Sequence, residues 1–321
     1  MNLTEFESKL NQLGLKRVPF FFLIDFEMEN PMAWEMREVP KEILFSVSGF
    51  TNTKAEVKKQ KVQLKKYPIS YHEYKSKFDI VENRISFGDS YLTNLTIKTK
   101  IEIDHSLEEL FFQTSAKYKV LWKNKFLVFS PETFIRMESG KIFSFPMKGT
   151  IDASIPDAEK LILKDQKELS EHITIVDLIR NDLSRVASDV SVKRFRYIEK
   201  IRTNQKDLLQ VSSEIRGKLP DDFHSIIGSI VISMLPAGSV SGAPKNKTLQ
   251  IIREAEKEKR SYYTGVVGYY DGNNLDSGVM IRFIEQDKDQ FYYRSGGGIT
   301  SQSKAESEYQ ETIDKIYVPV Y

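Results

Sequence analysis

The chain of 321 residues carries 47 basic and 45 acidic side chains, and 40% of it is hydrophobic. Its net charge of +2 argues against a broad surface for nucleic acid or membrane. The sequence has no cysteine, which excludes disulfides, a thiolate nucleophile and cysteine-bound zinc. Its four histidines form no H-x-x-x-H pair, so any metal is expected to be held by carboxylates, which favours magnesium or calcium.

The first 30 residues predict a short helix followed by a buried strand. Thr4 and Glu7 have the spacing of a capping box, and residues 19–26 are mostly apolar. This segment lacks the basic start and apolar run of a signal peptide, and the run at 20–26 is far too short to span a membrane. We therefore expect a cytoplasmic protein.

A basic tract follows at residues 54–66, which include six lysines. Binding to nucleic acid is one interpretation, and salt-dependent binding to DNA would support it. Because Glu56 interrupts the tract and no aromatic residue is interleaved, a solvated helix or loop is favoured.

The rest of the chain predicts hairpin groups of strands with helices between them. Strands are expected at 120–129, 134–145 (with a turn at Gly140), 262–270, 275–285 and 290–295. Helices are expected at 156–187 and 244–257, and from a capping box at Ser303 and Glu306 through residue 317. This order predicts an α+β fold of antiparallel sheets covered by helices. No Pro/Gly/Ser-rich linker separates two domains, so a single domain over 1–321 is expected.

Lys148 is the first candidate for chemistry. It lies in segment 145–150 (FPMKGT), directly after an alternating run that is typical of a strand. Glycine and threonine after the lysine indicate a backbone held close to a small ligand. The lysine then becomes a candidate nucleophile that forms a covalent amine adduct. The alternative is a lysine in an exposed turn.

Two helices each carry a pair of glutamates three residues apart, Glu168 with Glu171 and Glu308 with Glu311. This spacing places both carboxylates on one helix face. If the two faces meet, four carboxylates would repel one another unless a divalent cation neutralised them, and magnesium suits such a site. The alternative for each pair is an ordinary solvated helix face.

Three further features are compatible with an anionic ligand. Arg282 lies in an apolar run and could grip a carboxylate or extend to solvent. Residues 296–298 are three glycines whose backbone could approach an anion, or a plain loop. Residues 236–245 (PAGSVSGAPK) form a second glycine-containing connection, which lacks the Walker spacing. Glu132, in residues 130–132 (SPE), is a separate candidate, a lone acid at a strand turn, and an ordinary turn residue is the favoured alternative.

Taken in order, these segments resemble the chorismate-utilising enzymes, the family of the large subunits of anthranilate synthase and aminodeoxychorismate synthase. The likeness rests on residues 130–132 with 146–150, 168–186 (ELSEHITIVDLIRNDLSRV), 236–245, and the GVVGYYDG, IRF, GGGIT and ESEYQETIDK segments within 265–315. The motif-bearing part begins at about residue 85, and the portion at about 1–84 is short for the family. The resemblance implies two facing antiparallel sheets flanked by helices.

The resemblance also implies a magnesium-dependent reaction on chorismate. Residues like Glu171 and Glu311 hold Mg²⁺ in the family, and those like Glu168 and Glu308 support the site. The metal in turn grips the ring carboxylate, and the acid matching Glu132 assists departure of the ring hydroxyl. The substrate-binding residues implied are Gly149, Thr150, Ser239, Tyr269, Arg282, Gly298 and Lys315.

Lys148 distinguishes between members of the family. Anthranilate synthases usually have alanine at this position, whereas aminodeoxychorismate synthases have lysine. The resemblance is therefore closest to aminodeoxychorismate synthase component I, which makes 4-amino-4-deoxychorismate for 4-aminobenzoate and folate and belongs to the transaminase class. A glutamine amidotransferase partner is expected to supply ammonia, since this sequence has no cysteine to hydrolyse glutamine. The alternatives are anthranilate synthase component I and a non-catalytic chorismate-binding protein.

Two positions depart from the family pattern. Leu92 stands where isochorismate and salicylate synthases have a lysine base and the aminating members have glutamine, which disfavours water activation. Gln210 stands where the family usually has histidine, and glutamine cannot transfer a proton near neutral pH. Because the N-terminal portion is short, feedback control by tryptophan is not expected.

Overall fold

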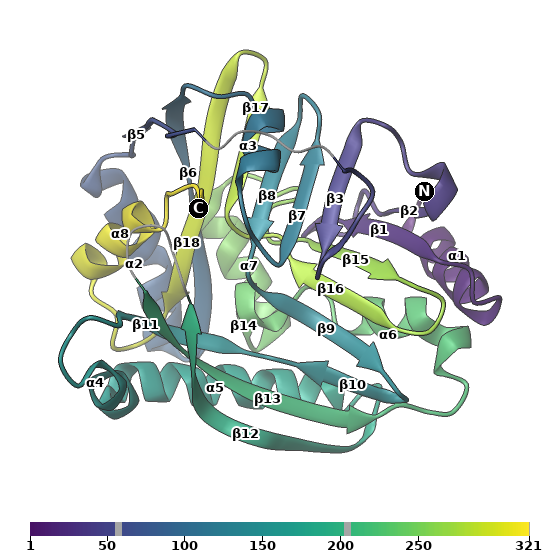
Figure 1. Ribbon diagram of the computed structural model, residues 1–321. Helices are drawn as coiled ribbons and strands as arrows, with labels where there is room; N and C mark the ends of the chain where they lie inside the picture. Colours follow the sequence, from purple (N-terminus) through teal and green to yellow (C-terminus); the bar gives the residue numbers. More distant parts are fainter. Residues whose placement is uncertain (55–59, 202–206, 321) are drawn as a thin grey trace. The chain divides into compact units, whose positions relative to one another are not determined.

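A computed structural model describes residues 1–54, 60–201 and 207–320 (Figure 1). The chain divides into two compact units, each discontinuous in sequence. Unit 1 comprises Met1–Val39, Glu132–Ser239 and Gly265–Val279, and unit 2 comprises Pro40–Pro131, Val240–Thr264 and Met280–Tyr321. Each unit contains one antiparallel sheet with helices packed on it.

The sheet of unit 1 has the strand order β11-β13-β10-β9-β16-β15-β1-β2, and β12 pairs with β13. Its strands are β1 (Phe20–Ile24), β2 (Met32–Glu35), β9 (Thr133–Glu138), β10 (Lys141–Ser144), β11 (Met147–Asp152), β12 (Ser188–Ile201), β13 (Leu208–Lys218), β15 (Val266–Tyr270) and β16 (Leu275–Val279). Its helices are α1 (Leu3–Leu15), α4 (Ala158–Lys164), α5 (Gln166–Leu183) and α6 (Ile227–Ser233), with 3₁₀ turns η1 (Met36–Glu38), η2 (Phe223–Ile226) and η3 (Gly238–Val240).

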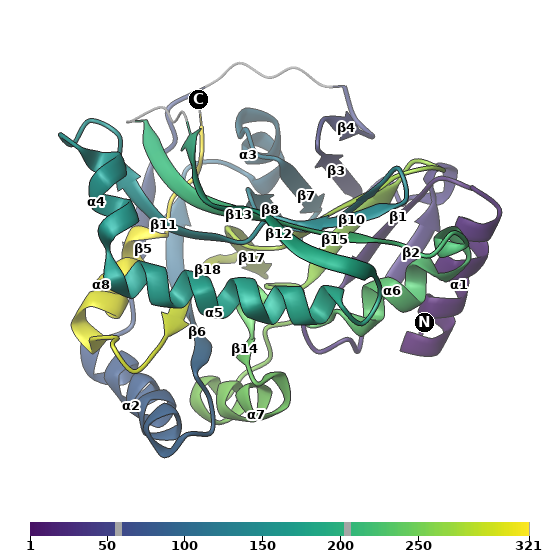
Figure 2. The same ribbon diagram turned by 90° about the horizontal axis from the view of Figure 1, so that it is seen from below.

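Helix α5 positions the acidic residues of unit 1. Its apolar residues Ile175, Val176, Ile179 and Leu183 recur at helical spacing and are buried. This face packs along β11, β12 and β13, as Figure 2 shows. The opposite end of the sheet is anchored by β1, in which every residue is buried. Packing of this apolar face fixes the rotation of α5 about its axis, and that rotation sets the direction in which its polar side chains point.

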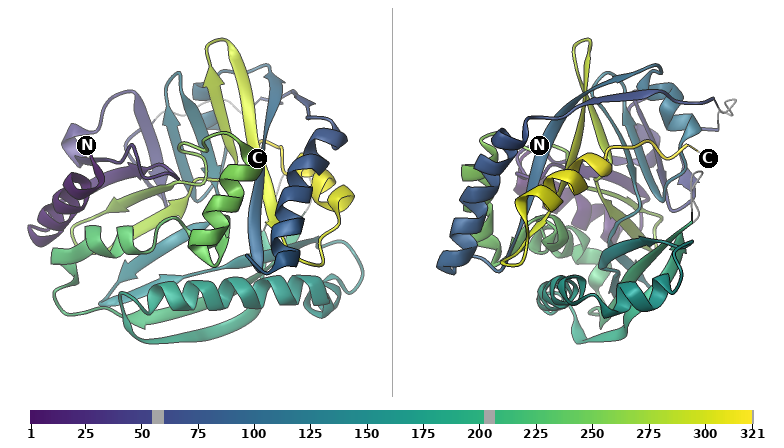
Figure 3. Two further views of the ribbon diagram at one scale, coloured as in Figure 1. Left: turned by 180° about the vertical axis from the view of Figure 1, so that it is seen from behind. Right: turned by 90° about the vertical axis from the view of Figure 1, so that its left-hand side faces the viewer.

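The sheet of unit 2 has the strand order β14-β6-β18-β17-β8-β7-β3-β4, and β5 pairs with β6. Its strands are β3 (Ile43–Val47), β4 (Phe50–Thr51), β5 (Leu64–Tyr67), β6 (Leu92–Ile103), β7 (Tyr118–Trp122), β8 (Phe126–Ser130), β14 (Gly242–Ala243), β17 (Phe283–Asp287) and β18 (Gln290–Ile299). Its helices are α2 (Tyr71–Phe87), α3 (Leu107–Gln113), α7 (Lys245–Glu256) and α8 (Ala305–Asp314). Helices α2, α7 and α8 pack beside β6 and β18, as both views of Figure 3 show.

The α+β class with two antiparallel sheets flanked by helices is confirmed, whereas several predicted boundaries are wrong. The helix expected at 156–187 is two helices, because Asp165 is extended and its side chain accepts a hydrogen bond from Glu168 N to cap α5. The strand expected at 275–285 is also two strands, separated by Arg282 in the left-handed region at φ 54°. The segment 120–129 covers a hairpin of β7 and β8 rather than one strand.

Both predicted capping boxes are wrong. Helix α1 begins two residues earlier than a cap at Thr4 predicts, because Asn2 and Glu5 form the reciprocal capping bonds. Helix α8 has Lys304 as its N-cap without a side-chain cap bond, and it ends at Asp314 rather than at residue 317.

Part of the basic tract is a strand, and the solvated helix or loop expected there is wrong for Leu64–Tyr67, which pairs with β6. Residues 55–59 of the tract lie outside the described residues. One segment, Phe223–Val240, is long and apolar enough for a membrane span by composition alone. It is 61% buried and is divided among η2, α6 and η3, as expected of a core segment.

Candidate active site

Lys148 lies on β11, which excludes the exposed-turn interpretation. The pairing of β11 with β13 shifts register between Lys148 and Thr150, so Gly149 forms a bulge with φ of 74°. The side chain of Lys148 is 20% exposed, and its ammonium lies 3.2 Å from Oε2 of Glu171. The bulge thus directs a half-buried lysine toward the acidic face of α5.

Glu168 and Glu171 both reach the bulge from α5. A Cβ atom added to Gly149 would lie 3.0 Å from Oε2 of Glu168, so the absence of a side chain at this position leaves room for that carboxylate. Glu168 lies in the first turn of α5, where the helix dipole favours a negative charge. The predicted pairing of these two acids on one face is confirmed, and a lysine accompanies them.

His172, beside Glu171 on α5, is a feature that the sequence reasoning missed. Its side chain is buried, and Nε2 lies 2.6 Å from Oγ of Ser213 on β13. Burial lowers the pKa of His172 to about 4, with smaller contributions from Arg196 and Lys148. The histidine is therefore neutral near pH 7 and holds α5 against β13.

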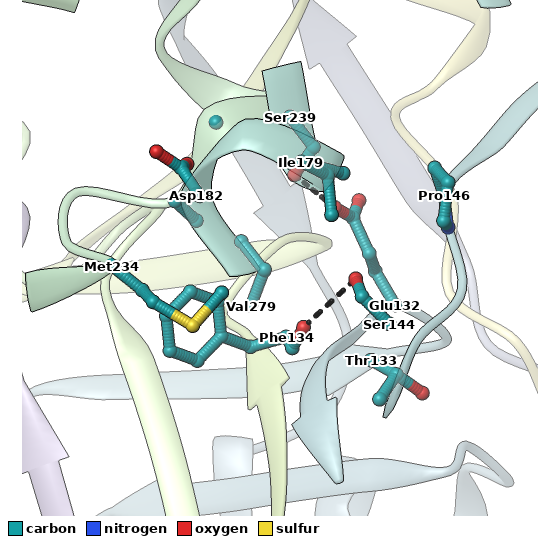
Figure 4. A pocket seen from close by; sticks show the side chains of 12 residues that line it. Glu132, Thr133, Phe134, Ser144, Pro146, Ile179, Asp182, Met234, Ser239 and Val279 are labelled. Atoms are coloured by element: carbon teal, nitrogen blue, oxygen red, sulfur yellow. Dashed lines mark hydrogen bonds between the residues drawn. The ribbon is translucent and has the colours of Figure 1, made fainter. Parts of the chain in front are cut away.

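Glu132 and Ser239 meet in unit 1, where the Ser239 hydroxyl donates a hydrogen bond to Oε1 of Glu132. The backbone of Glu132 is fixed as well, because its carbonyl accepts from Val279 N at 3.0 Å. Figure 4 shows both side chains at a small cavity that Asp182 also lines. The cavity holds about 20 Å³, which is room for roughly one water molecule and not for a ring-sized substrate. Ser239 therefore orients Glu132.

The remaining predicted residues of unit 1 are less enclosed. Thr150 is exposed on β11 opposite Gln210. Tyr269 lies half-buried on β15, and burial together with Asp271 raises its pKa. A second hollow of about 520 Å³ lies beside α4 and includes none of the predicted site residues.

In unit 2, helix α8 directs Glu308, Glu311 and Lys315 toward the glycines of β18. Glu308 is buried, and Lys315 Nζ lies 2.6 Å from Oε1 of Glu311 and donates to Gly296 O at 2.8 Å. A Cβ atom on Gly297 would lie 3.4 Å from Oε2 of Glu308, 3.6 Å from Lys315 Nζ and 3.7 Å from Oε1 of Glu311. Gly296 and Gly297 thus border a charged cluster.

The glycines of residues 296–298 belong to a strand, so the prediction of a loop or of a segment after a strand is wrong. Gly296, Gly297 and Gly298 pair with Thr96, Leu95 and Asn94 of β6. Leu92 begins β6 and is buried. The ladder with β6 holds the glycines in extended form, so they lie alongside α8 in a rigid element.

Arg282 is held at both its backbone and its side chain. Its carbonyl accepts from Phe129 N at 3.1 Å, and its Nε donates to Tyr317 Oη at 3.2 Å. The guanidinium carbon lies 5.2 Å from the centre of the Tyr317 ring. Arg282 is therefore a half-buried cation with an imposed orientation.

The carboxylates suit a hard divalent cation, because magnesium prefers oxygen ligands and usually retains water. Glycine at positions 149 and 297 lets the carboxylates of each glutamate pair lie directly against the strand backbone. Within the described ranges, no group of three or more His, Asp or Glu side chains is already arranged to hold a metal ion.

A family model described as a chorismate binding enzyme matches residues 24–320. The chain belongs to the chorismate-binding enzyme family. It is 49% identical to an uncharacterised PabA-like protein of Pasteurella multocida, over all of both chains. It is also 33% identical to aminodeoxychorismate synthase component 1 of Salmonella typhimurium, over 76% of this chain and 56% of that enzyme.

Solved structures agree with this family assignment. Anthranilate synthase component I of Streptococcus pneumoniae superposes with a TM-score of 0.67 at 26% identity, over 81% of this chain and 60% of that one. An isochorismate synthase of Bacillus anthracis described as specific for 2,3-dihydroxybenzoate superposes with a TM-score of 0.74 over 98% of this chain and 87% of that one. Its 17% identity shows a shared fold alone.

Proposed function

We propose that this member of the chorismate-binding family is an aminodeoxychorismate synthase component I, which converts chorismate and ammonia to 4-amino-4-deoxychorismate and water. The observation that carries the proposal is the half-buried amine of Lys148 beside Glu171. An amine in this setting is suited to covalent catalysis once it is neutral. The likeness to an enzyme of that name over 76% of the chain supports the same activity.

The proposed chemistry has two displacements. The neutral Lys148 amine forms a C–N bond to the ring while the C–O bond to the ring hydroxyl breaks, and Glu132 donates the proton that makes the hydroxyl leave as water. Ammonia then forms its own C–N bond as the bond to Lys148 breaks. Lys148 must first lose a proton and leave its ion pair with Glu171. The ion pair therefore belongs to the enzyme before the reaction starts.

Glu168, Glu171, Glu308 and Glu311 are the proposed ligands of Mg²⁺, which would neutralise the ring carboxylate of chorismate. Lys315 and Arg282 supply positive charge for the substrate's carboxylates. Ser239 keeps Glu132 oriented for proton donation through its hydrogen bond. The proposal also includes Gly149, Thr150, Tyr269 and Gly298 as substrate-binding residues, a glutamine amidotransferase as the source of ammonia, and a cytoplasmic location.

The principal alternative is anthranilate synthase component I. An enzyme of that description from Aquifex aeolicus is 36% identical over 195 residues, which cover 58% of this chain and 38% of that enzyme. Lys148 favours the aminodeoxychorismate synthase reaction, because the anthranilate synthases usually have alanine at this position.

Product identity distinguishes these functions. The purified chain is incubated with chorismate, Mg²⁺ and an ammonium salt, and the products are identified by mass and fluorescence. A product of the mass of aminodeoxychorismate is expected. Fluorescent anthranilate would establish the alternative instead, and unaltered chorismate despite measurable binding would identify a non-catalytic binding protein.

A further inference from the structure

Tyr317 lies immediately beyond the predicted site residues, in the segment that follows α8. The residue is 42% exposed, yet its backbone is fixed, because the hydroxyl of the buried Tyr293 donates to Tyr317 O at 2.9 Å. The flanking residues are anchored too. Ile316 is fully buried in the core of unit 2, and Val320 forms a β-bridge with Thr114.

This anchoring brings the Tyr317 hydroxyl to Arg282. The hydroxyl accepts from Arg282 Nε at 3.2 Å, and the guanidinium carbon lies 5.2 Å from the ring centre. Arginine has five N–H donors in a planar fork, and the Nε–H is engaged by the tyrosine. The two Nη nitrogens then form the end of the fork that can grip a carboxylate bidentately.

The backbone at Arg282 supports the same conclusion. A non-glycine residue with φ of 54° is uncommon, and such conformations persist where the surroundings impose them. Here the Arg282 carbonyl is held by Phe129 N and the side chain by Tyr317. Two independent contacts therefore determine where the guanidinium points.

We propose that Tyr317 is a positioning residue for Arg282, which it presents end-on to a carboxylate of the substrate. This inference rests on the proposed function, in which Arg282 binds chorismate. Tyr317 does not touch the reacting atoms; it reduces the freedom of the guanidinium before the substrate arrives. Its loss should weaken substrate binding and leave the chemical step nearly unchanged.

The test compares Tyr317→Phe with Tyr292→Phe. Tyr292 is the control because it is a tyrosine of unit 2 that also lies beside a cation, with Lys98 Nζ 4.2 Å from its ring, although it is less exposed than Tyr317. Steady-state kinetics, direct binding of chorismate and urea unfolding are measured for both. Tyr317→Phe is expected to raise KM and Kd by roughly three- to tenfold, with kcat within about twofold and an unchanged urea midpoint. Values equal to those of Tyr292→Phe would overturn the inference.

A double-mutant cycle with Arg282→Lys separates positioning from general support of the fold. If Tyr317 acts through Arg282, Tyr317→Phe should change chorismate affinity by less than about twofold in the Arg282→Lys background. Fully additive effects would contradict the proposal. Wild-type protein that neither binds nor converts chorismate would defeat the proposed function itself, an outcome that is visible before any variant is made.

Discussion

The Lys148 ammonium lies 3.2 Å from Oε2 of Glu171, so the proposed nucleophile is paired with a proposed ligand of the metal. A cation that took this carboxylate would remove the group that stabilises the charged lysine. The neutral amine needed for attack would then form more readily. In the proposed reaction, binding of the metal would thereby help to activate the nucleophile.

Replacing the proposed nucleophile tests covalent catalysis. Lys148→Ala should lower the rate of amination by at least about 10³-fold, because no other group is proposed to form the adduct. Binding of chorismate in the presence of Mg²⁺ should remain largely intact. Lys141→Ala, on β10, which β13 separates from β11, removes an exposed lysine and should retain full activity. Full activity in Lys148→Ala would remove this residue from the mechanism.

The metal assignment is tested by a neutral isostere. Glu171→Gln should weaken Mg²⁺ binding by about tenfold or more, because a carboxylate ligand becomes an amide. Calorimetric titration of the substrate-free protein measures this without reference to turnover, and Glu311→Gln should behave in the same way. Glu138→Gln changes an exposed acid on β9 and serves as the control. An unchanged titration in Glu171→Gln would refute the assignment.

The sequence predicted which nearby side chains share a helix face better than it predicted the bounds of the helices and strands. Local spacing was sufficient for Glu168 and Glu171, because residues three apart share a helix face. It failed for residues 296–298, because glycine disfavours strands and only the long pairing with β6 holds them extended. Arg282 was placed within a strand because its neighbours are apolar, and no local signal marks its left-handed backbone. The contact of His172 with Ser213 joins residues far apart in sequence, which only the fold brings together.

The bulge at Gly149 can be tested by a matched pair of glycines. Gly149 and Gly140 have φ values of 74° and 71°, so alanine at either position should cost about 1–2 kcal/mol of unfolding free energy from backbone strain. A Cβ atom at Gly149 would also press on Glu168, whereas at Gly140 it would meet nothing within 4 Å. Urea unfolding should therefore show a loss in both variants, at least as large in Gly149→Ala, but only Gly149→Ala should lose activity. Equal activity in the two variants would mean that the bulge does not constrain the site.

His172 should make stability depend on pH. Its folded-state pKa of about 4 lies below the usual 6.5, so the unfolded chain binds more protons between these values. The contribution of His172 to the free energy of unfolding is fully present above pH 6.5. It falls by roughly 3 kcal/mol in total as the pH falls toward 4. In His172→Gln the decline of unfolding free energy over this window should be shallower. If wild type and His172→Gln had identical profiles of unfolding free energy against pH, His172 would contribute nothing to the pH dependence of stability.

Removing one partner of the buried ion pair of Arg260 and Glu256 should destabilise unit 2 far more than breaking a surface pair does. Both side chains are 1% exposed, and Arg260 also donates to Val240 O and Asn94 O, each at 2.7 Å. Arg260→Met would leave Glu256 buried without its counterion and should cost about 3–5 kcal/mol of unfolding free energy. Arg84→Met breaks an exposed pair with Glu254 and should change little, because water already screens that pair. The urea concentration at the midpoint of unfolding is measured for both variants. If Arg260→Met unfolded at the same urea concentration as Arg84→Met, the buried pair would have no special role in holding β6 and the segment near Val240 together.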